Sequence, residues 1–263
     1  MIVVKTQGGL CNQIFQWAYG YSLSKDCGKK LFIDDSFFRG GCMGCTPREF
    51  QLHKFKKINL HLFEGDVIQN FFTSPVFKIV DHHTYQDIDC SSINGNILLD
   101  GYWQSEIYFK KYRKDIVSII GANKSDYSQY DFKNSCSLHV RRTDYLNLPD
   151  YHFNLTESYY EKALEIINPK GYVYIFSDDI QWCKNTFKIN NAIFMENNSP
   201  IEDLHLMSLC SNNIIANSSF SWWGAWLNKN PRKKVIAPSV WFGPDGPLTK
   251  NILPSKWIKI DPK

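Results

Sequence analysis

The second half of the chain alternates short apolar runs with segments of helical periodicity, and this alternation constrains the fold more than any other feature. Strands buried on both faces of a parallel sheet take the form of such runs, and a helix connects each to the next. The pattern predicts a parallel, doubly wound α/β sheet with right-handed crossovers, in which ligands bind beyond the carboxyl ends of the strands. The expected strands cover residues 136–140, 172–176, 192–195, 213–216 and 234–237, and the expected helices cover 156–167, 180–187, 201–210 and 220–227.

The N-terminal residues predict a second α/β unit. The β-branched run 2–4 precedes Gly8-Gly9, and apolar residues spaced for one helix face follow. Residues 30–34 suit the next strand, residues 97–102 suit another, and residues 106–120 suit an amphipathic helix. No element is assigned within residues 40–95.

A polar, aperiodic segment at residues 123–134 is the best candidate for a linker between domains. We therefore expect an N-terminal domain over residues 1–125 and a C-terminal domain over residues 126–263. An alternative for the last residues of the chain is that they pack back on the first domain.

The net charge of the chain is +4, from 30 Lys and Arg against 26 Asp and Glu. Nucleic-acid binding needs a concentrated basic face, so we expect no nucleic-acid partner. The small excess suits an anionic small-molecule donor or a peripheral contact with an acidic membrane. The N-terminal residues show no long apolar region behind a basic start, and no apolar stretch reaches about 18 residues. We therefore expect no signal peptide and no membrane span, and a cytoplasmic protein that is at most peripheral at the inner face of a membrane.

The eight cysteines are scattered along the chain. Cys136 and Cys210 lie in apolar runs, as is typical of reduced, buried thiols. Cys42 and Cys45 form one C-x-x-C pair with no second pair at zinc-finger spacing, which favours a Gly-rich loop over a zinc or redox site. The Asp81-His82-His83 segment lacks a third ligand at a suitable spacing, so no metal site is predicted.

Residues 139–144 (HVRRTD) directly follow an expected strand. Arg141 and Arg142 would then present guanidinium groups at the ligand edge of the sheet, and guanidinium binds diphosphate oxygens in a bidentate manner. The alternative is a surface arginine pair with Asp144 as its ion-pair partner. Taken alone, this segment favours neither interpretation over the other.

Residues 217–224 (NSSFSWWG) follow another expected strand and begin a helix. The first turn of a helix offers backbone N–H groups and, here, several hydroxyls to a phosphate. Plain N-capping by Asn or Ser is the alternative. Capping alone does not require three serines interleaved with aromatic residues.

Two further segments carry candidate polar groups. Gly8-Gly9 lies at a strand-to-helix turn where Asn12 and Gln13 could bind hydroxyls or phosphates, and a simple tight turn is the alternative. Asp178, after the expected strand 172–176, could pair with a guanine base or cap the next helix. Because these clusters share the strand ends of one architecture, the combination points to a nucleotide-sugar site.

With these segments in place, the sequence resembles the bacterial and animal α-1,2-fucosyltransferases, a family more distantly related to α-1,6- and protein-O-fucosyltransferases. The HVRRTD and NSSFSWWGAWL segments are the specific ones. The resemblance extends over residues 8–20, 48–55, 101–109, 137–146, 175–179 and 217–227, in family order. At the position after Gly8-Gly9-Leu10, where the family commonly has glycine, this chain has Cys11, which we expect to line the cleft and to react with thiol reagents.

The resemblance implies an α/β, GT-B-like fold, with two Rossmann-type domains whose parallel sheets face each other across a cleft. It implies transfer of fucose from GDP-fucose to the 2-hydroxyl of a terminal β-galactoside, with inversion and without a metal or other cofactor. Arg141 is then the diphosphate contact and His139 lies near the nucleotide, while Arg142 and Asp144 support the loop. The implied donor-binding residues are Gly8, Gly9, Asn12, His139, Arg141, Arg142, Asp178, Asn217, Ser218, Ser219 and Phe220.

The expected mechanism is a single in-line displacement in which Arg141 and the helix start at Ser218-Ser219 stabilise the departing diphosphate. Asp150 is the first candidate for the general base, followed by Asp144 and His152. The alternatives are a fucosyltransferase of α-1,6 or protein-O linkage, and a non-catalytic nucleotide-sugar-binding protein. A nucleic-acid binder is disfavoured by the charge balance.

Overall fold

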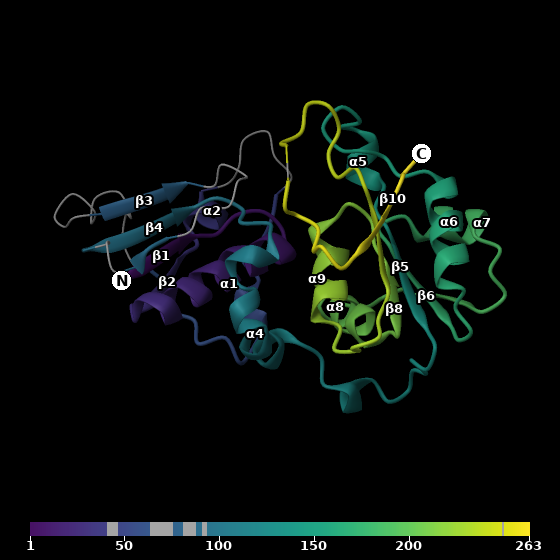
Figure 1. Cartoon of the computed structure of the whole chain (residues 1–263), viewed down its shortest axis with the longest axis horizontal. Coiled ribbons are helices and arrows are strands. Elements are labelled where there is room, and N and C mark those ends of the chain that lie inside the picture. Colours follow the sequence, from purple (N-terminus) through teal and green to yellow (C-terminus); the bar gives the residue numbers. More distant parts are fainter. Residues whose placement is uncertain (41–46, 64–75, 81–87, 91–93, 249) are drawn as a thin grey trace. The chain divides into compact units, whose positions relative to one another are not determined.

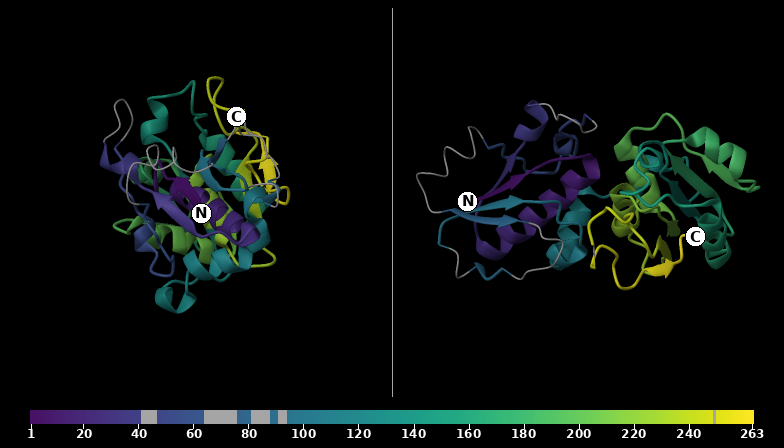
Figure 2. Two further views of the ribbon diagram at one scale, coloured as in Figure 1. Left: turned by 90° about the vertical axis from the view of Figure 1, so that its left-hand side faces the viewer. Right: turned by 90° about the horizontal axis from the view of Figure 1, so that it is seen from above.

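The computed structural model describes residues 1–40, 47–63, 76–80, 88–90, 94–248 and 250–263. Two compact units make up the chain (Figure 1): Met1–Ile120 with Thr249–Pro254, and Gly121–Leu248 with Ser255–Lys263. Figure 2 shows the N-terminus in the first unit and the C-terminus in the second. The chain first passes from one unit to the other between Ile120 and Gly121, just before the expected linker.

The first unit contains a four-stranded parallel sheet in the order β2-β1-β4-β3. In β1, one of the two inner strands, Val3 pairs with Phe32 on one side and with Leu98 on the other. The strands expected at residues 2–4, 30–34 and 97–102 are confirmed, and β3 lies where no element was assigned. The strands are β1 (Ile2–Lys5), β2 (Leu31–Asp34), β3 (Val76–Val80) and β4 (Asn96–Asp100).

The longest helix among the described residues of this unit packs closely on the inner strand β1. A side chain at Gly20 would approach Val4 Cγ2 to 2.4 Å, so glycine allows the helix to lie against β1. The helix ends at Gly28, whose φ of 62° is the left-handed conformation that glycine favours. The helical segments are α1 (Leu10–Cys27), α2 (Ser36–Arg39), α4 (Arg113–Ile120) and the 3-10 turns η1 (Leu52–Lys54), η3 (Glu106–Tyr108) and η4 (Lys110–Tyr112).

The single helix expected over residues 106–120 is wrong in its first half, which forms two 3-10 turns. Phe109 joins these turns with φ −143°, outside the helical region. Its side chain is fully buried and packs against Phe15 of α1. Tertiary packing of one aromatic ring thus overrides the helical periodicity of the segment.

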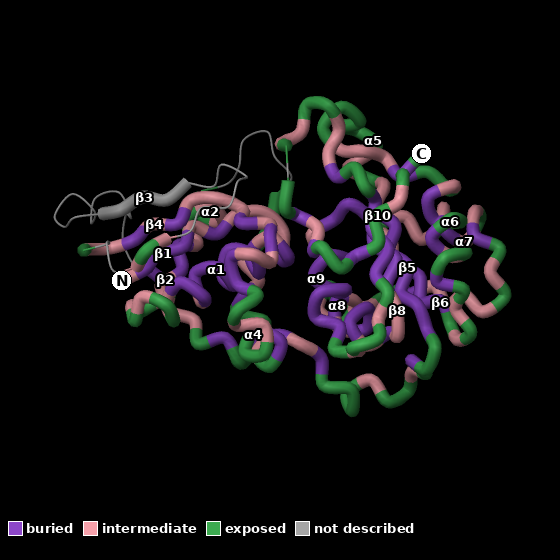
Figure 3. Tube along the Cα trace, in the orientation of Figure 1, coloured by how far each residue is buried: buried purple, intermediate pink, exposed green. Residues whose placement is uncertain are grey.

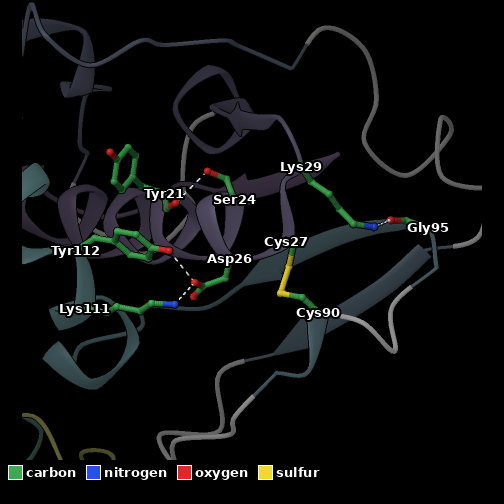
Figure 4. Close-up of a disulfide and its surroundings, with 9 residues drawn as sticks. All are labelled: Tyr21, Ser24, Asp26, Cys27, Lys29, Cys90, Gly95, Lys111 and Tyr112. Carbon is green, nitrogen blue, oxygen red and sulfur yellow. Dashed lines mark hydrogen bonds and ion pairs between the residues drawn. A yellow bond between two sulfur atoms is a disulfide. The ribbon is translucent and has the colours of Figure 1, made fainter.

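A disulfide joins Cys27, at the end of α1, to Cys90 (Figure 4). The sequence did not indicate this pair. Because disulfides persist mainly in oxidising compartments, the bond does not support the cytoplasmic location expected from the sequence. The thiols expected to be reduced and buried at Cys136 and Cys210 are confirmed.

The second unit contains a six-stranded, all-parallel sheet in the order β10-β9-β8-β5-β6-β7. The chain winds outward from β5 through β6 to β7, then crosses to β8 on the other side of β5. The strand order therefore reverses between β5 and β8, which is the topological switch point where doubly wound sheets bind ligands. The strands are β5 (Cys136–Val140), β6 (Val173–Ser177), β7 (Ala192–Phe194), β8 (Asn212–Ile214), β9 (Val235–Pro238) and β10 (Ile258–Ile260).

Helices cover both faces of this sheet, with α6 and α7 on one side and α8 and α9 on the other (Figure 1). In β6, Val173 and Ile175 belong to one buried cluster, and Tyr174 and Phe176 belong to another. This explains why the strand is a continuous apolar run, coloured as buried in Figure 3. The helical segments are η5 (Lys124–Tyr127), α5 (Thr143–Leu146), α6 (Glu157–Ile167), α7 (Ile180–Thr186), α8 (Pro200–Leu209) and α9 (Ser219–Leu227).

All five strands and all four helices expected in the second half are confirmed. Strand β10 was missed, because Ile258–Ile260 alternates with lysine and has no apolar run. Its partner is β9, so the last residues pair within the second unit.

Candidate active site

The polar segments of the second unit gather at one edge of its sheet. Strands β8, β5 and β6 are neighbours, and the segments after them begin at Ile215, Arg141 and Asp178. Because the strands are parallel, their carboxyl ends lie side by side. The candidate residues that follow these three strands are therefore brought together beside the switch point.

Arg141 is held between two carboxylates. Its Nη2 donates to Asp144 Oδ2 at 2.6 Å, and its Nη1 lies 3.4 Å from Asp178 Oδ2. Burial lowers the pKa of Arg141, but the Asp144 hydrogen bond and the Asp178 charge outweigh that effect and raise it overall. The two ion pairs fix the guanidinium group of Arg141. The side chain is still 25% exposed, so a ligand can reach it.

Asp178 organises the turn that follows β5. Its carboxylate accepts the main-chain N–H of Arg142 at 3.0 Å and that of Thr143 at 3.1 Å, and it also accepts the Thr143 hydroxyl. Asp179, not Asp178, caps the next helix by accepting the Trp182 N–H at 3.1 Å. The sequence did not foresee this link from the end of β6 to the start of α5.

The Arg142 side chain contacts residues at the start of α7 and not the two carboxylates that hold Arg141. Its Nε is 3.4 Å from Asp179 Oδ2, and its guanidinium lies 4.1 Å from the centre of the Trp182 ring. An ion pair and a cation–π contact hold the side chain in place. This arrangement suits the supporting role implied for Arg142.

His139 is buried beside the start of α9. Its Nδ1 lies 2.9 Å from Ser221 Oγ, and its ring packs on Phe220 with 5.6 Å between centroids. Burial and the charge of Arg141 lower the pKa of His139 to about 3, so the ring is neutral at pH 7. Ser221 lies within a segment that the sequence analysis singled out, but the sequence did not predict its contact with His139.

The N-terminus of α9 opens on this edge, because the helix follows β8 after a short turn. Ser218 caps the helix, accepting the Phe220 N–H at 3.3 Å. Asn217 is buried and donates from Nδ2 to the carbonyls of Phe153 and Trp241, both at 2.8 Å. Capping is thus present, and the remaining first-turn N–H groups give the edge a partial positive charge.

The three candidate bases have different surroundings. Asp144 is paired with Arg141, as described. Asp150 is exposed, and its main-chain carbonyl accepts the Asp245 N–H at 2.9 Å. His152 stacks on Tyr145, with ring centroids 3.8 Å apart and planes 1° from parallel.

In the first unit, the glycine turn lies where β1 and β4 end side by side. Gly8 has φ 75°, and a side chain there would approach Asn12 Nδ2 to 2.8 Å. Asn12 Oδ1 accepts a hydrogen bond from Gln104 Nε2 at 2.9 Å. Gln13 is fully buried and bonds the carbonyls of Gly8 and Glu49, so it serves the turn itself.

Cys11 does not behave as expected from the sequence. The residue is 3% exposed, and burial raises the pKa of its thiol well above the ordinary value. A thiol that is buried and protonated reacts slowly. The burial of Cys11 does not support the expectation that this residue lines a cleft and reacts with thiol reagents.

In the part of the chain that the structure describes, no three His, Cys, Asp or Glu side chains are grouped to hold a metal ion. The Asp81-His82-His83 segment and the Cys42–Cys45 pair lie outside the described residues. Among the described helices, none is both long and apolar enough to cross a membrane.

Known structures share this architecture. Fucosyltransferase NodZ from Bradyrhizobium aligns over 85% of this chain and 91% of its own, with a TM-score of 0.52 and 14% identity. A mutant of Arabidopsis thaliana FUT1 in complex with GDP aligns over 90% of this chain and 70% of its own, with a TM-score of 0.50 and 12% identity. The two parallel α/β sheets and these neighbours confirm the expected GT-B-like fold class.

Sequence relatives cover nearly the whole chain. The O-antigen biosynthesis glycosyltransferase WbnK of Escherichia coli is 31% identical over 96% of this chain and 98% of its own length. An α-1,2-colitosyltransferase of Escherichia coli is also 31% identical, over 99% of both chains. The family described as Glycosyl transferase family 11 matches residues 1–261. The chain therefore belongs to glycosyl transferase family 11, the fucosyltransferase family that its motifs resemble.

Proposed function

We propose that the protein transfers L-fucose from GDP-β-L-fucose to the 2-hydroxyl of a terminal β-galactoside, forming an α-1,2 linkage with inversion. The observation that carries the proposal is that Arg141 follows β5 and the α9 N-terminus follows β8, two neighbouring parallel strands at the switch point. Both are suited to bind a diphosphate. The α-1,2 linkage named for the colitosyltransferase relative supports the regiochemistry.

The donor diphosphate is assigned to Arg141 and to Ser218-Ser219. Arg141 is already ion-paired with Asp144 and Asp178, so its side chain is ordered before the ligand arrives. His139 is neutral and therefore adds no charge beside the nucleotide. Asn217 and Phe220 flank the Ser218-Ser219 pair at the turn between β8 and α9, whereas Asp178 and Arg142 support the separate turn that follows β5.

The reaction is a single displacement at the anomeric carbon. The acceptor oxygen forms the new bond as the bond to the GDP oxygen breaks, and the acceptor proton passes to a base. Arg141 and the partial charge of the α9 N-terminus stabilise the negative charge of the departing diphosphate. With these two groups in that role, the proposed reaction uses no metal and no cofactor.

We assign the base to Asp150. Asp144 is committed to Arg141, and His152 is stacked on Tyr145. Asp150 is exposed in the same loop, where its carboxylate is accessible to an acceptor hydroxyl.

A colitose donor is the second candidate, because the α-1,2-colitosyltransferase relative spans the whole chain. Colitose is a fucose analogue, so the same diphosphate site would serve both donors. The WbnK relative acts in O-antigen biosynthesis, which makes an O-antigen repeat unit the acceptor to test beside lactose. The net charge of +4 suits peripheral contact with a membrane carrying such an acceptor.

The deciding experiment incubates the purified protein with GDP-fucose, EDTA and lactose, and determines the linkage of the product by NMR. A fucosyl-α-1,2-galactose product supports donor, linkage, inversion and metal independence together. Tight GDP-fucose binding without product would retain the donor site and reject lactose as acceptor. If the protein does not bind GDP-fucose but turns over a colitose donor, its donor sugar is colitose and not fucose.

A further inference from the structure

Tyr145, the third residue of α5, contacts both the arginine and the helix turn of the candidate site. The Arg141 guanidinium lies 5.6 Å from the centre of its ring, within the range of a cation–π contact. Its hydroxyl donates to the main-chain carbonyl of Asn217 at 3.1 Å. One side chain thus connects the segment after β5 with the segment after β8, across the switch point.

The ring of His152 supports Tyr145 from the far end of the same loop. The two rings are stacked, with centroids 3.8 Å apart and an interplanar angle of 1°. The His152 main chain donates to the Leu148 carbonyl at 2.8 Å and forms an antiparallel bridge with Phe242. These two contacts fix the main chain of His152 and so limit where its ring can lie.

Asn217 closes the connection. Its side-chain amide donates to the carbonyl of Phe153, next to His152, and to that of Trp241, next to Phe242. The same residue accepts the Tyr145 hydroxyl through its main chain. Arg141, the Tyr145–His152 stack and the start of α9 consequently form one connected set of contacts.

We infer that the Tyr145–His152 stack is a positioning pair, which holds the Arg141 fork and the Asn217-Ser218 turn at the separation that a diphosphate requires. The identity of the ligand rests on the proposed function. The two carboxylates that neutralise Arg141 attract it by charge, whereas the aromatic face restricts the plane in which its fork can lie. Bidentate recognition depends on that plane.

His152 acts in this pair as a flat ring. Its Nδ1 is buried and has no hydrogen-bond partner among the residues that the structure describes. Burial lowers the pKa of His152, with the charge of Arg141 lowering it further and that of Asp144 opposing. A phenylalanine ring at this position preserves the stack and loses no hydrogen bond at Nδ1.

The test compares Tyr145→Leu and His152→Ala, which remove the stack, with His152→Phe, which keeps it. The first readout is the ¹⁵N NMR order parameter of the Arg141 Nε–Hε group, which needs no substrate. We expect it to fall below about 0.6 in the first two variants and to recover in His152→Phe. An order parameter unchanged in Tyr145→Leu and His152→Ala would overturn the inference.

The second readout is the kinetics with GDP-fucose. The Leu and Ala variants should lose about tenfold in kcat with KM changed by less than about threefold, and His152→Phe should recover most of the rate. If His152→Phe is as slow as His152→Ala, the imidazole itself is needed and the stack is not the reason. An inactive wild-type protein would refute the proposed function, and the NMR comparison would still decide the positioning role.

Tyr145→Phe is the conservative variant, because it removes only the hydroxyl and keeps the ring that packs in the fold. The Arg141 order parameter should stay at the wild-type value, while the lost bond to the Asn217 carbonyl costs a few-fold in kcat. A fall of the order parameter in Tyr145→Phe equal to that in Tyr145→Leu would show that the ring face is not what orders Arg141.

Discussion

The carboxylate of Asp178 accepts the main-chain N–H of Arg142 at 3.0 Å, so a residue at the end of β6 fixes the turn that follows β5. Its other oxygen accepts the Thr143 N–H at 3.1 Å. An asparagine retains one acceptor and turns an NH₂ group toward a donor. We predict that Asp178→Asn lowers the free energy of unfolding by about 2 kcal/mol and kcat by about tenfold, as measured by urea denaturation and by GDP-fucose turnover.

The same carboxylate gives this prediction a pH dependence. Burial raises the pKa of Asp178, but the Thr143 hydrogen bond and the Arg141 charge outweigh it and hold the pKa below 3.8. A lowered folded-state pKa stabilises the protein above the unfolded value, and that stabilisation is lost as the pH falls through the folded value. The stability difference between wild type and Asp178→Asn should therefore shrink below about pH 4. Asp245→Asn, at an exposed position, is the control and should change the free energy of unfolding by less than about 0.5 kcal/mol.

Arg141→Lys tests whether the fork or only the charge is required. Lysine keeps one positive charge but cannot contact Asp144 and Asp178 with separate nitrogens while binding a diphosphate. We expect kcat to fall about 100-fold in Arg141→Lys and about 1000-fold in Arg141→Ala, as for loss of a transition-state donor. The exposed Arg232→Lys serves as the matched control. Turnover of Arg141→Ala within a few-fold of wild type would remove Arg141 from the mechanism.

Asp150→Asn tests the general base. Loss of a base costs about 100-fold or more in rate, and the donor site lies elsewhere, so the dissociation constant of GDP should not change. Steady-state kinetics and calorimetric titration with GDP separate the two effects. Asp245→Asn is the control, since its main chain pairs with Asp150 in the same exposed region. A near-normal kcat for Asp150→Asn would exclude this residue.

The sequence predicted the second unit well because its signals are local. Each strand there is an apolar run buried on both faces, and each helix has a clear periodicity, so strand ends and the residues after them could be placed. The Arg141 and Ser218 segments were found in this way. That these two segments lie side by side also requires β5 and β8 to be neighbours, which the structure shows.

What the sequence could not predict depends on contacts between distant segments. Asp178 bonds the N–H groups of Arg142 and Thr143 only because β5 and β6 are neighbours. The stacking of His152 on Tyr145 depends on the bridge from His152 to Phe242, far along the chain. No local pattern marks either pair. The same holds for the Cys27–Cys90 disulfide, whose partners are 63 residues apart.

The Cys27–Cys90 disulfide should contribute measurably to stability. It ties the C-terminal end of α1 to a segment 63 residues later, and closing a loop of that length restricts the unfolded chain. We predict that the Cys27→Ala/Cys90→Ala double variant loses about 3 kcal/mol in free energy of unfolding. Reduction of the wild type should give a similar loss and should change the double variant far less. Equal sensitivity of both proteins to the reductant would show that the bond does not form in solution.

Asn213 should be a stability residue without a role in the reaction. It is fully buried, and its side chain donates to Ser137 Oγ at 2.7 Å and to the Met207 carbonyl at 2.8 Å. Its Oδ1 accepts Asn228 Nδ2 at 2.8 Å. Asn213→Ala therefore leaves three buried polar groups short of a partner and should lower the free energy of unfolding by about 3 kcal/mol.

The matched control is Asn185→Ala on the exposed face of α7, which should change the free energy of unfolding by less than about 0.5 kcal/mol. Below the melting transition, Asn213→Ala should keep the wild-type KM for GDP-fucose, because its partners lie in the core and not at the strand ends. Denaturation and kinetics on the same samples test both claims. A raised KM in a fully folded Asn213→Ala protein would mean that this buried network, through β8, also positions the Ser218 turn.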